Sequence, residues 1–149
     1  MVKNMHARVK HLVQKYGTRN PEKLAREMGI VVIKRPFNKT MGFFKKALGK
    51  KFIVVNSNLP YTHQLIVIAH ELGHALYHSS NSEIFLHEYT LFPRGKYEVE
   101  ANRFAAELLI NEKELDKYQF ENMTVEQIAA YFEVPKELVE YKFNWKKYY

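Results

Sequence analysis

The hydrophobic positions of this chain have a helical spacing near both ends and a strand-like pattern between them. In residues 2–16 and 21–28, apolar side chains recur every three to four positions, and a glycine follows each segment, Gly17 and Gly29. A glycine directly after such a segment is typical of a helix end, so the pattern predicts two helices. Asn20 is a suitable N-cap for the second helix.

The next region is rich in β-branched and aromatic residues and predicts a small sheet. Its segments are residues 30–33, 41–48 and 51–56, which we interpret as about three antiparallel strands. Residues 48–50, Leu-Gly-Lys, supply the turn between the last two. An edge strand of this hairpin could pair with an extended peptide or could simply cover the helices.

After Asn58 the spacing is helical again, apart from residues 79–95. Residues 60–110 are predicted to contain two long helices, and residues 112–145 further short ones. The sequence therefore predicts a mainly helical α+β domain over residues 1–149, with the small sheet beside the first long helix. This length, with 46% hydrophobic residues, suits a single domain with a substantial core.

The first long helix contains the sequence His-Glu-Leu-Gly-His at residues 70–74. In a helix, a step of four residues returns to within about 40° of the same face, so His70 and His74 can bind one metal ion. A metal held by neutral imidazoles polarises a bound water, and Glu71 is the candidate general base for that water. The alternative is a solvated helix with two chance histidines, but the apolar residues 65–69 indicate burial.

A catalytic zinc ion usually has three protein ligands, so a third is expected outside this motif. The best source is the helical segment 96–110, which contains Glu98. On a helical wheel, Ala101 and Ala105 lie on the face of Glu98, so this helix could approach the motif closely. Asn102 lies one turn from Glu98 and could hydrogen-bond a ligating histidine. Glu98 is therefore favoured as the third ligand.

Other polar residues near the two helices are weaker candidates. Glu100 is the main rival for the third ligand, but the wheel places it on the opposite face with Arg103 and Glu107, where we expect solvated side chains. His63 and His78 lie near the motif stripe. His70 and His78 are two helical turns apart, roughly 12 Å, which is too far for one tetrahedral ion to bridge. His63 and His78 are therefore interpreted as outer partners or simply polar residues.

Residues 79–95 separate the two long helices and are too apolar for a solvated linker, so we expect them to fold over the cleft. If the metal-bound water attacks a carbonyl group, a hydrogen-bond donor is also needed for the charge that develops on the carbonyl oxygen. Three residues near the motifs could supply it, namely Tyr77, Tyr97 and His87, and the sequence does not choose among them.

Composition narrows the chemistry and the compartment. Because the chain has no cysteine, it has neither disulfides nor thiolate ligands, which leaves histidine and carboxylates to bind a metal. The N-terminus lacks the apolar stretch of a signal peptide, and the longest apolar run, residues 65–69, is far shorter than the ~20 residues that span a bilayer. We therefore expect a cytoplasmic protein with no membrane partner.

The net charge of +7 raises a different function class, DNA binding. Residues 124–139 have the pattern of a helix, a tight turn and a second helix. Against this reading, Glu137 and Glu140 lie early in the presumed recognition helix, where base-reading helices carry Arg, Asn or Gln. The basic side chains come later, at Lys142, Lys146 and Lys147. Direct nucleic-acid binding is the weaker hypothesis.

The two motifs together resemble the ImmA/IrrE family of zinc metallopeptidases (the M78 or DUF955 type). The resemblance rests on H-E-L-G-H-A-L-Y-H at residues 70–78 and E-x-E-A-N-R-F-A-A-E-L-L-I at residues 98–110. Residues 124–142 are also similar to the tail of the ImmA anti-repressors, whereas the first fifty residues match only in pattern. One departure is visible, because Ile110 is followed by Asn111 where members often have Met-Pro.

This resemblance implies a zincin-like fold and a gluzincin-like metalloendopeptidase, with Glu98 as the third zinc ligand. It also implies a substrate: ImmA proteins act on helix-turn-helix repressors of phages and mobile elements, and cleavage derepresses the element. The alternative is a metal-containing anti-repressor that binds the repressor without cutting it. Two histidines and a carboxylate favour Zn²⁺, although Mn²⁺ and Fe²⁺ suit the same donor set.

Overall fold

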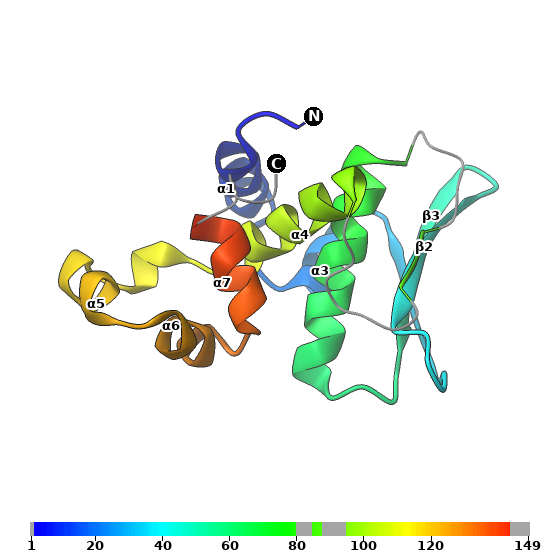
Figure 1. Ribbon diagram of the computed structural model, residues 1–149. Coiled ribbons are helices and arrows are strands. Elements are labelled where there is room, and N and C mark those ends of the chain that lie inside the picture. The colour runs from blue at the N-terminus through cyan, green and yellow to red at the C-terminus, as the bar shows by residue number, and fades with distance from the viewer. Residues whose placement is uncertain (1, 80–84, 88–94, 144–149) are drawn as a thin grey trace.

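Helices make up most of the molecule, and a small sheet lies at one side of them (Figure 1). The computed structural model describes residues 2–79, 85–87 and 95–143. The helices are α1 (Met5–Tyr16), α2 (Pro21–Glu27), α3 (Tyr61–Tyr77), α4 (Lys96–Leu109), α5 (Lys117–Asn122), α6 (Val125–Phe132) and α7 (Lys136–Phe143), with a short 3-10 helix, η1 (Glu112–Glu114). The strands are β1 (Val31–Arg35), β2 (Gly42–Ala47), β3 (Lys50–Asn56) and β4 (Phe85–His87). The predicted α+β class is confirmed.

The two N-terminal helices have the caps that their sequences favour. The side chain of Asn20 accepts a hydrogen bond from the backbone N–H of Lys23 and so caps α2 as predicted. Helix α1 begins later than predicted, because Asn4 takes a left-handed conformation and accepts a hydrogen bond from the N–H of Ala7. Gly17, also left-handed with φ of 70°, ends α1 as expected.

The sheet has four strands in the order β1-β3-β2-β4. Strands β2 and β3 form the predicted antiparallel hairpin, and Leu48 and Gly49 both have positive φ in its turn. Strand β1, however, pairs in parallel with β3. The sheet is therefore mixed, which corrects the expectation of a purely antiparallel sheet. Side chains alternate between faces in both strand directions, so the pattern alone could not distinguish them.

The additional strand β4 comes from the segment predicted to fold over the cleft. Its backbone pairs antiparallel with β2 over residues 42–44. At these residues β2 therefore has a neighbour on both sides, β3 and β4, and the hairpin does not offer an open edge to a peptide there. The rest of the segment between α3 and α4, apart from residues 79, 85–87 and 95, lies outside the described residues.

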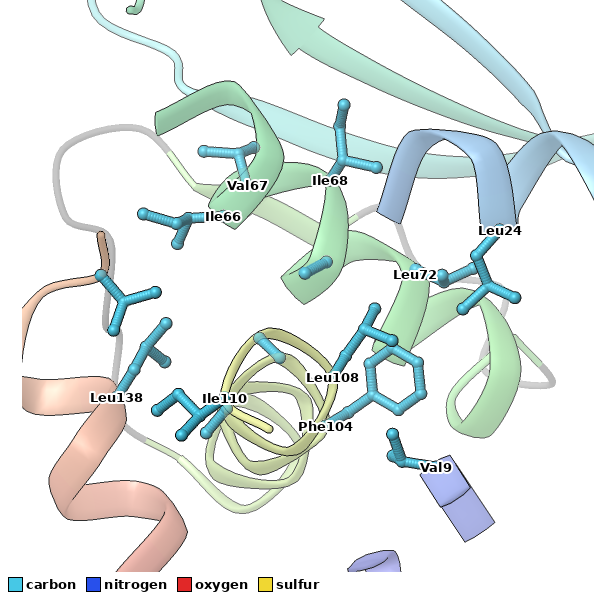
Figure 2. Close-up of a cluster of buried hydrophobic side chains, with 14 of the residues drawn as sticks. Val9, Leu24, Ile66, Val67, Ile68, Leu72, Phe104, Leu108, Ile110 and Leu138 are labelled. Atoms are coloured by element: carbon cyan, nitrogen blue, oxygen red, sulfur yellow. The ribbon is translucent and has the colours of Figure 1, made fainter. Parts of the chain in front are cut away.

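Helix α3 lies between the sheet and α4, and apolar side chains fill the space on both sides of it (Figures 1 and 2). A Cβ atom on Gly73 would lie only 3.1 Å from the Cα atom of Ala101 and 3.2 Å from the Cβ atom of Phe104. The two helices thus approach each other closely at Gly73, as the small residues of α4 predict. The fully buried apolar side chains of this core include Phe44, Ile53, Ile68, Leu72, Phe104 and Leu108.

Helices α6 and α7 form the predicted helix, turn and helix, but α7 is packed on α4. Leu138, Val139 and Tyr141 are buried on α7. The side chain of Lys142 is only 3% exposed and lies 2.8 Å from a carboxylate oxygen of Glu107. Lys142 is therefore paired inside the protein and is not a free basic side chain of the presumed recognition helix; Lys146 and Lys147 lie outside the described residues. Among the described helices, none has the length and apolar character needed to cross a membrane.

Candidate metal centre

Helix α3 buries the three polar residues of its motif. The residues next to the motif in α3 are mostly apolar, and the helix packs against the sheet, α2 and α4. As a result His70 is 4% exposed, and Glu71 and His74 are fully buried. The rings of His70 and His74 lie on successive turns with centroids 4.9 Å apart. The helix therefore presents two imidazoles and a carboxylate in an environment with little water.

Helix α4 brings Glu98 to both histidines from its first turn. The Oε2 atom of Glu98 lies 2.9 Å from Nε2 of His70 and 3.1 Å from Nε2 of His74. One ligand atom from each of these residues lies within 4.8 Å of the others, and among the described residues this is the group of histidines and carboxylates that could hold a metal ion. The structure thus brings together the three residues predicted as ligands.

The two donor separations that involve Glu98 are compatible with a divalent ion. With zinc–ligand distances of about 2.0–2.1 Å and tetrahedral angles, neighbouring ligand atoms are about 3.3 Å apart. The contacts of 2.9 and 3.1 Å to Glu98 are close to that value. Nitrogen and carboxylate oxygen are also the donors that zinc accepts in catalytic sites. His70, His74 and Glu98 are therefore suited to hold the metal.

Glu98 is held in its ionised form, as a ligand must be. Burial by itself raises the pKa of Glu98, but hydrogen bonds from His70 and His74, together with their charges, outweigh burial and bring this pKa well below its usual range. The carboxylate is therefore ionised at neutral pH, even though its side chain is only 17% exposed.

The other nitrogen of each histidine has a defined partner. Nδ1 of His70 lies 2.6 Å from Oδ1 of Asn102 on α4. This is the contact predicted for Asn102 from its position one turn after Glu98. Nδ1 of His74 lies 2.9 Å from Nδ1 of His78. Because both Nδ1 atoms are engaged, each ring is fixed with Nε2 directed towards Glu98.

Comparison with known proteins identifies the family of this chain. Residues 25–144 match the IrrE N-terminal-like domain of peptidase family M78. The chain belongs to this family. It is 43% identical to the uncharacterized immunity region protein 2 of Bacillus phage phi105 over 139 residues, covering 91% of this chain and 87% of that protein. It is 31% identical to the metallopeptidase ImmA of Bacillus subtilis strain 168 over 146 residues, covering 95% of this chain and 85% of that protein. The resemblance stated above is thus confirmed.

In this M78 family member, Glu100 is not the solvated carboxylate that the helical wheel suggests. It is 2% exposed, its Oε1 atom lies 3.0 Å from Nε2 of His78, and its Oε2 atom accepts a hydrogen bond from the backbone N–H of Val2. Arg103 and Glu107 on the same face are also buried. The prediction failed because α1 and α7 cover the side of α4 that the wheel leaves to solvent.

His78 is an outer partner of the site, one of the two interpretations that the sequence allowed for it. It is 2% exposed and connects His74 to Glu100, whereas His63, the other histidine set aside, is exposed on the first turn of α3. The four-residue step from His74 to His78 was the available signal, because it places the two rings on the same side of a helix.

The candidate donors for a developing oxyanion are placed differently. The ring of Tyr77 packs edge-on against Phe104, 5.9 Å between centroids, and burial raises the pKa of its hydroxyl despite the nearby charge of Arg8. Tyr97 is 41% exposed, and its ring lies 4.6 Å from that of His78. Tyr97 is thus the tyrosine that contacts the polar network of the site. The side chain of His87 lies outside the described residues.

Proposed function

We propose that this chain is a zinc-dependent endopeptidase that cleaves a helix-turn-helix repressor and so derepresses phage or mobile-element genes. The observation that carries the proposal is the convergence of His70, His74 and Glu98 next to the buried Glu71, in a member of a metallopeptidase family. Its two relatives support the biological setting, because one is named for a phage immunity region and the other is named metallopeptidase ImmA. A repressor substrate would place the activity in the cytoplasm.

His70, His74 and Glu98 would hold the zinc, which when bound supplies a Lewis acid that polarises water and the substrate carbonyl. Glu71 follows His70 directly on α3 and is fully buried, which supports its proposed role as the general base. In the proposed reaction Glu71 takes a proton from the attacking water and delivers it to the leaving amine. The Oδ1 atom of Asn102 would hold the ring of His70 in place through its contact with Nδ1 of that histidine.

The direct test incubates the purified, zinc-loaded protein with candidate helix-turn-helix repressors and looks for discrete fragments by mass spectrometry. Glu71→Gln preserves the size of the side chain but removes the base, so it should keep zinc and slow cleavage by roughly 10²- to 10⁴-fold. His63→Leu, an exposed change on the same helix, is the matched control and should cleave normally.

Two outcomes would contradict this proposal in different ways. Equal fragment formation by Glu71→Gln would show that Glu71 is not the base. Repressor binding without fragments, in protein that holds zinc stoichiometrically, would favour the alternative of an anti-repressor that acts by binding alone.

A further inference from the structure

A line of buried polar contacts runs from the candidate ligand His74 to the N-terminal segment. Nδ1 of His74 lies 2.9 Å from Nδ1 of His78, and Nε2 of His78 lies 3.0 Å from Oε1 of Glu100. Oε2 of Glu100 accepts the N–H of Val2. His74, His78 and Glu100 are each at most 2% exposed, so these contacts have little competition from water.

Zinc binding at His74 would fix the direction of every hydrogen bond in this line. If Nε2 of His74 is the ligand atom, the neutral ring carries its proton on Nδ1 and donates it to Nδ1 of His78. His78 must then carry its own proton on Nε2, from which it donates to Glu100.

We propose that His78 and Glu100 are positioning residues that hold His74 as the Nδ1-protonated tautomer and strengthen its Nε2 atom as a metal ligand. The inference rests on the proposed zinc site. It gives the two histidine ligands different support, because His70 is backed by the neutral amide of Asn102 and His74 by an imidazole and a carboxylate. Hydrogen-bonded carboxylates behind a ligating histidine raise its basicity.

A role in packing alone does not explain these residues. A buried histidine and a buried carboxylate each lose hydration, and an apolar side chain would fill the same space at lower cost. His78 instead uses both ring nitrogens on partners from α3 and α4, and the ring of Tyr97 packs 4.6 Å from it. Directed contacts of this kind are what orientation of a ligand requires.

The test measures the affinity of the full chain for Zn²⁺ by competition with a chelator. His78→Leu should bind zinc about 10- to 100-fold more weakly. His78→Gln should recover much of that loss, because the amide oxygen can accept from His74 while the amide nitrogen donates to Glu100. His63→Leu, which removes an exposed imidazole from the same helix, should bind zinc as the wild type does.

A second measurement separates orientation from folding. In ¹⁵N NMR spectra of the zinc-loaded wild type, His74 should be protonated at Nδ1 and His78 at Nε2. If His78→Leu does not fold, Glu100→Gln decides the question; it keeps an acceptor for His78 but removes the charge, and should weaken zinc binding measurably. Unchanged zinc affinity in a folded His78→Leu or Glu100→Gln variant, or zinc ligation through Nδ1 of His74, would overturn this inference but not the proposed function. A wild-type chain that binds no zinc would overturn the proposed function itself.

Discussion

Each end of α4 carries a carboxylate that is largely shielded from solvent, and the two carboxylates have different partners. At the N-terminal end, Glu98 contacts the imidazoles of His70 and His74. At the C-terminal end, Glu107 lies 2.8 Å from the ammonium of Lys142 and 2.7 Å from Nδ1 of His6. The same helix therefore carries a cluster that can bind a metal and, two to three turns away, a cluster built as an ion pair.

The two clusters differ in whether the partners of the carboxylate can donate a lone pair to a metal. A neutral imidazole offers a lone pair to a metal, whereas a lysine ammonium has none. Lys142 lies 2.8 Å from Glu107 and 2.9 Å from Glu112, so it joins α7 to α4 and to η1. Arg19 adds hydrogen bonds to the backbone carbonyls of Glu107 and Leu108. Both partners of Glu98 can therefore be metal ligands, whereas of the partners of Glu107 the ammonium of Lys142 cannot.

Replacing one carboxylate at each end tests this contrast most strongly. Glu98→Ala removes a proposed ligand and should weaken zinc binding by roughly a thousandfold or more, a larger loss than is usual for an outer partner. Glu107→Ala should leave zinc affinity within about threefold of the wild type but lower the free energy of unfolding, because the buried Lys142 loses one of its two carboxylate partners. Chelator competition and urea unfolding give both quantities. Zinc loss in Glu107→Ala as large as in Glu98→Ala would remove the distinction.

Breaking the ion pair from its other side should have the next largest effect. Lys142→Met leaves Glu107 buried without its ammonium and should cost about 3–5 kcal/mol of stability, measured by urea unfolding. Adding Glu107→Leu should recover most of this loss, since an apolar pair of similar volume can replace a buried ion pair. Zinc affinity should not change in either protein. A Lys142→Met variant as stable as the wild type would show that the C-terminal cluster does not hold the helices together.

The same contrast shows what the sequence could predict. The spacing of His70 and His74 and the inward face of Glu98 follow from the helical repeat alone, and the structure brings all three together. The wheel was wrong for Glu100 and Glu107 because it gives angles around α4 but not the elements that cover them. Glu100 and Glu107 are buried because α1 and α7 pack on their side of α4. Strand direction in the sheet is likewise a long-range property.

The close approach of α3 and α4 can be perturbed without touching a polar residue. Gly73→Ala places a methyl group 3.1 Å from the Cα atom of Ala101 and should force the two helices apart by a few tenths of an ångström. We expect a net destabilisation of about 1–2 kcal/mol, because overpacking outweighs the gain in helix propensity, and a zinc affinity reduced by severalfold as Glu98 moves away from α3. Thr62→Ala, an exposed change on α3, is the control. A more stable Gly73→Ala with normal zinc affinity would contradict close packing at this point.

The smallest effect concerns acid stability of the C-terminal cluster. Burial raises the pKa of Glu112, but hydrogen bonding to Lys142 and the charge of that ammonium lower it below the ordinary value of 4.5. A carboxyl whose pKa is lower in the folded than in the unfolded chain stabilises the fold above the unfolded pKa, and this contribution is lost as the pH falls below about 4.5. In the presence of a chelator, Lys142→Met should therefore lose stability less steeply below that pH than the wild type does. Urea unfolding at a series of pH values would show this. Because Glu98 and Glu100 keep their histidine partners in that variant, parallel curves for the two proteins would assign the acid sensitivity to the metal end of α4 instead.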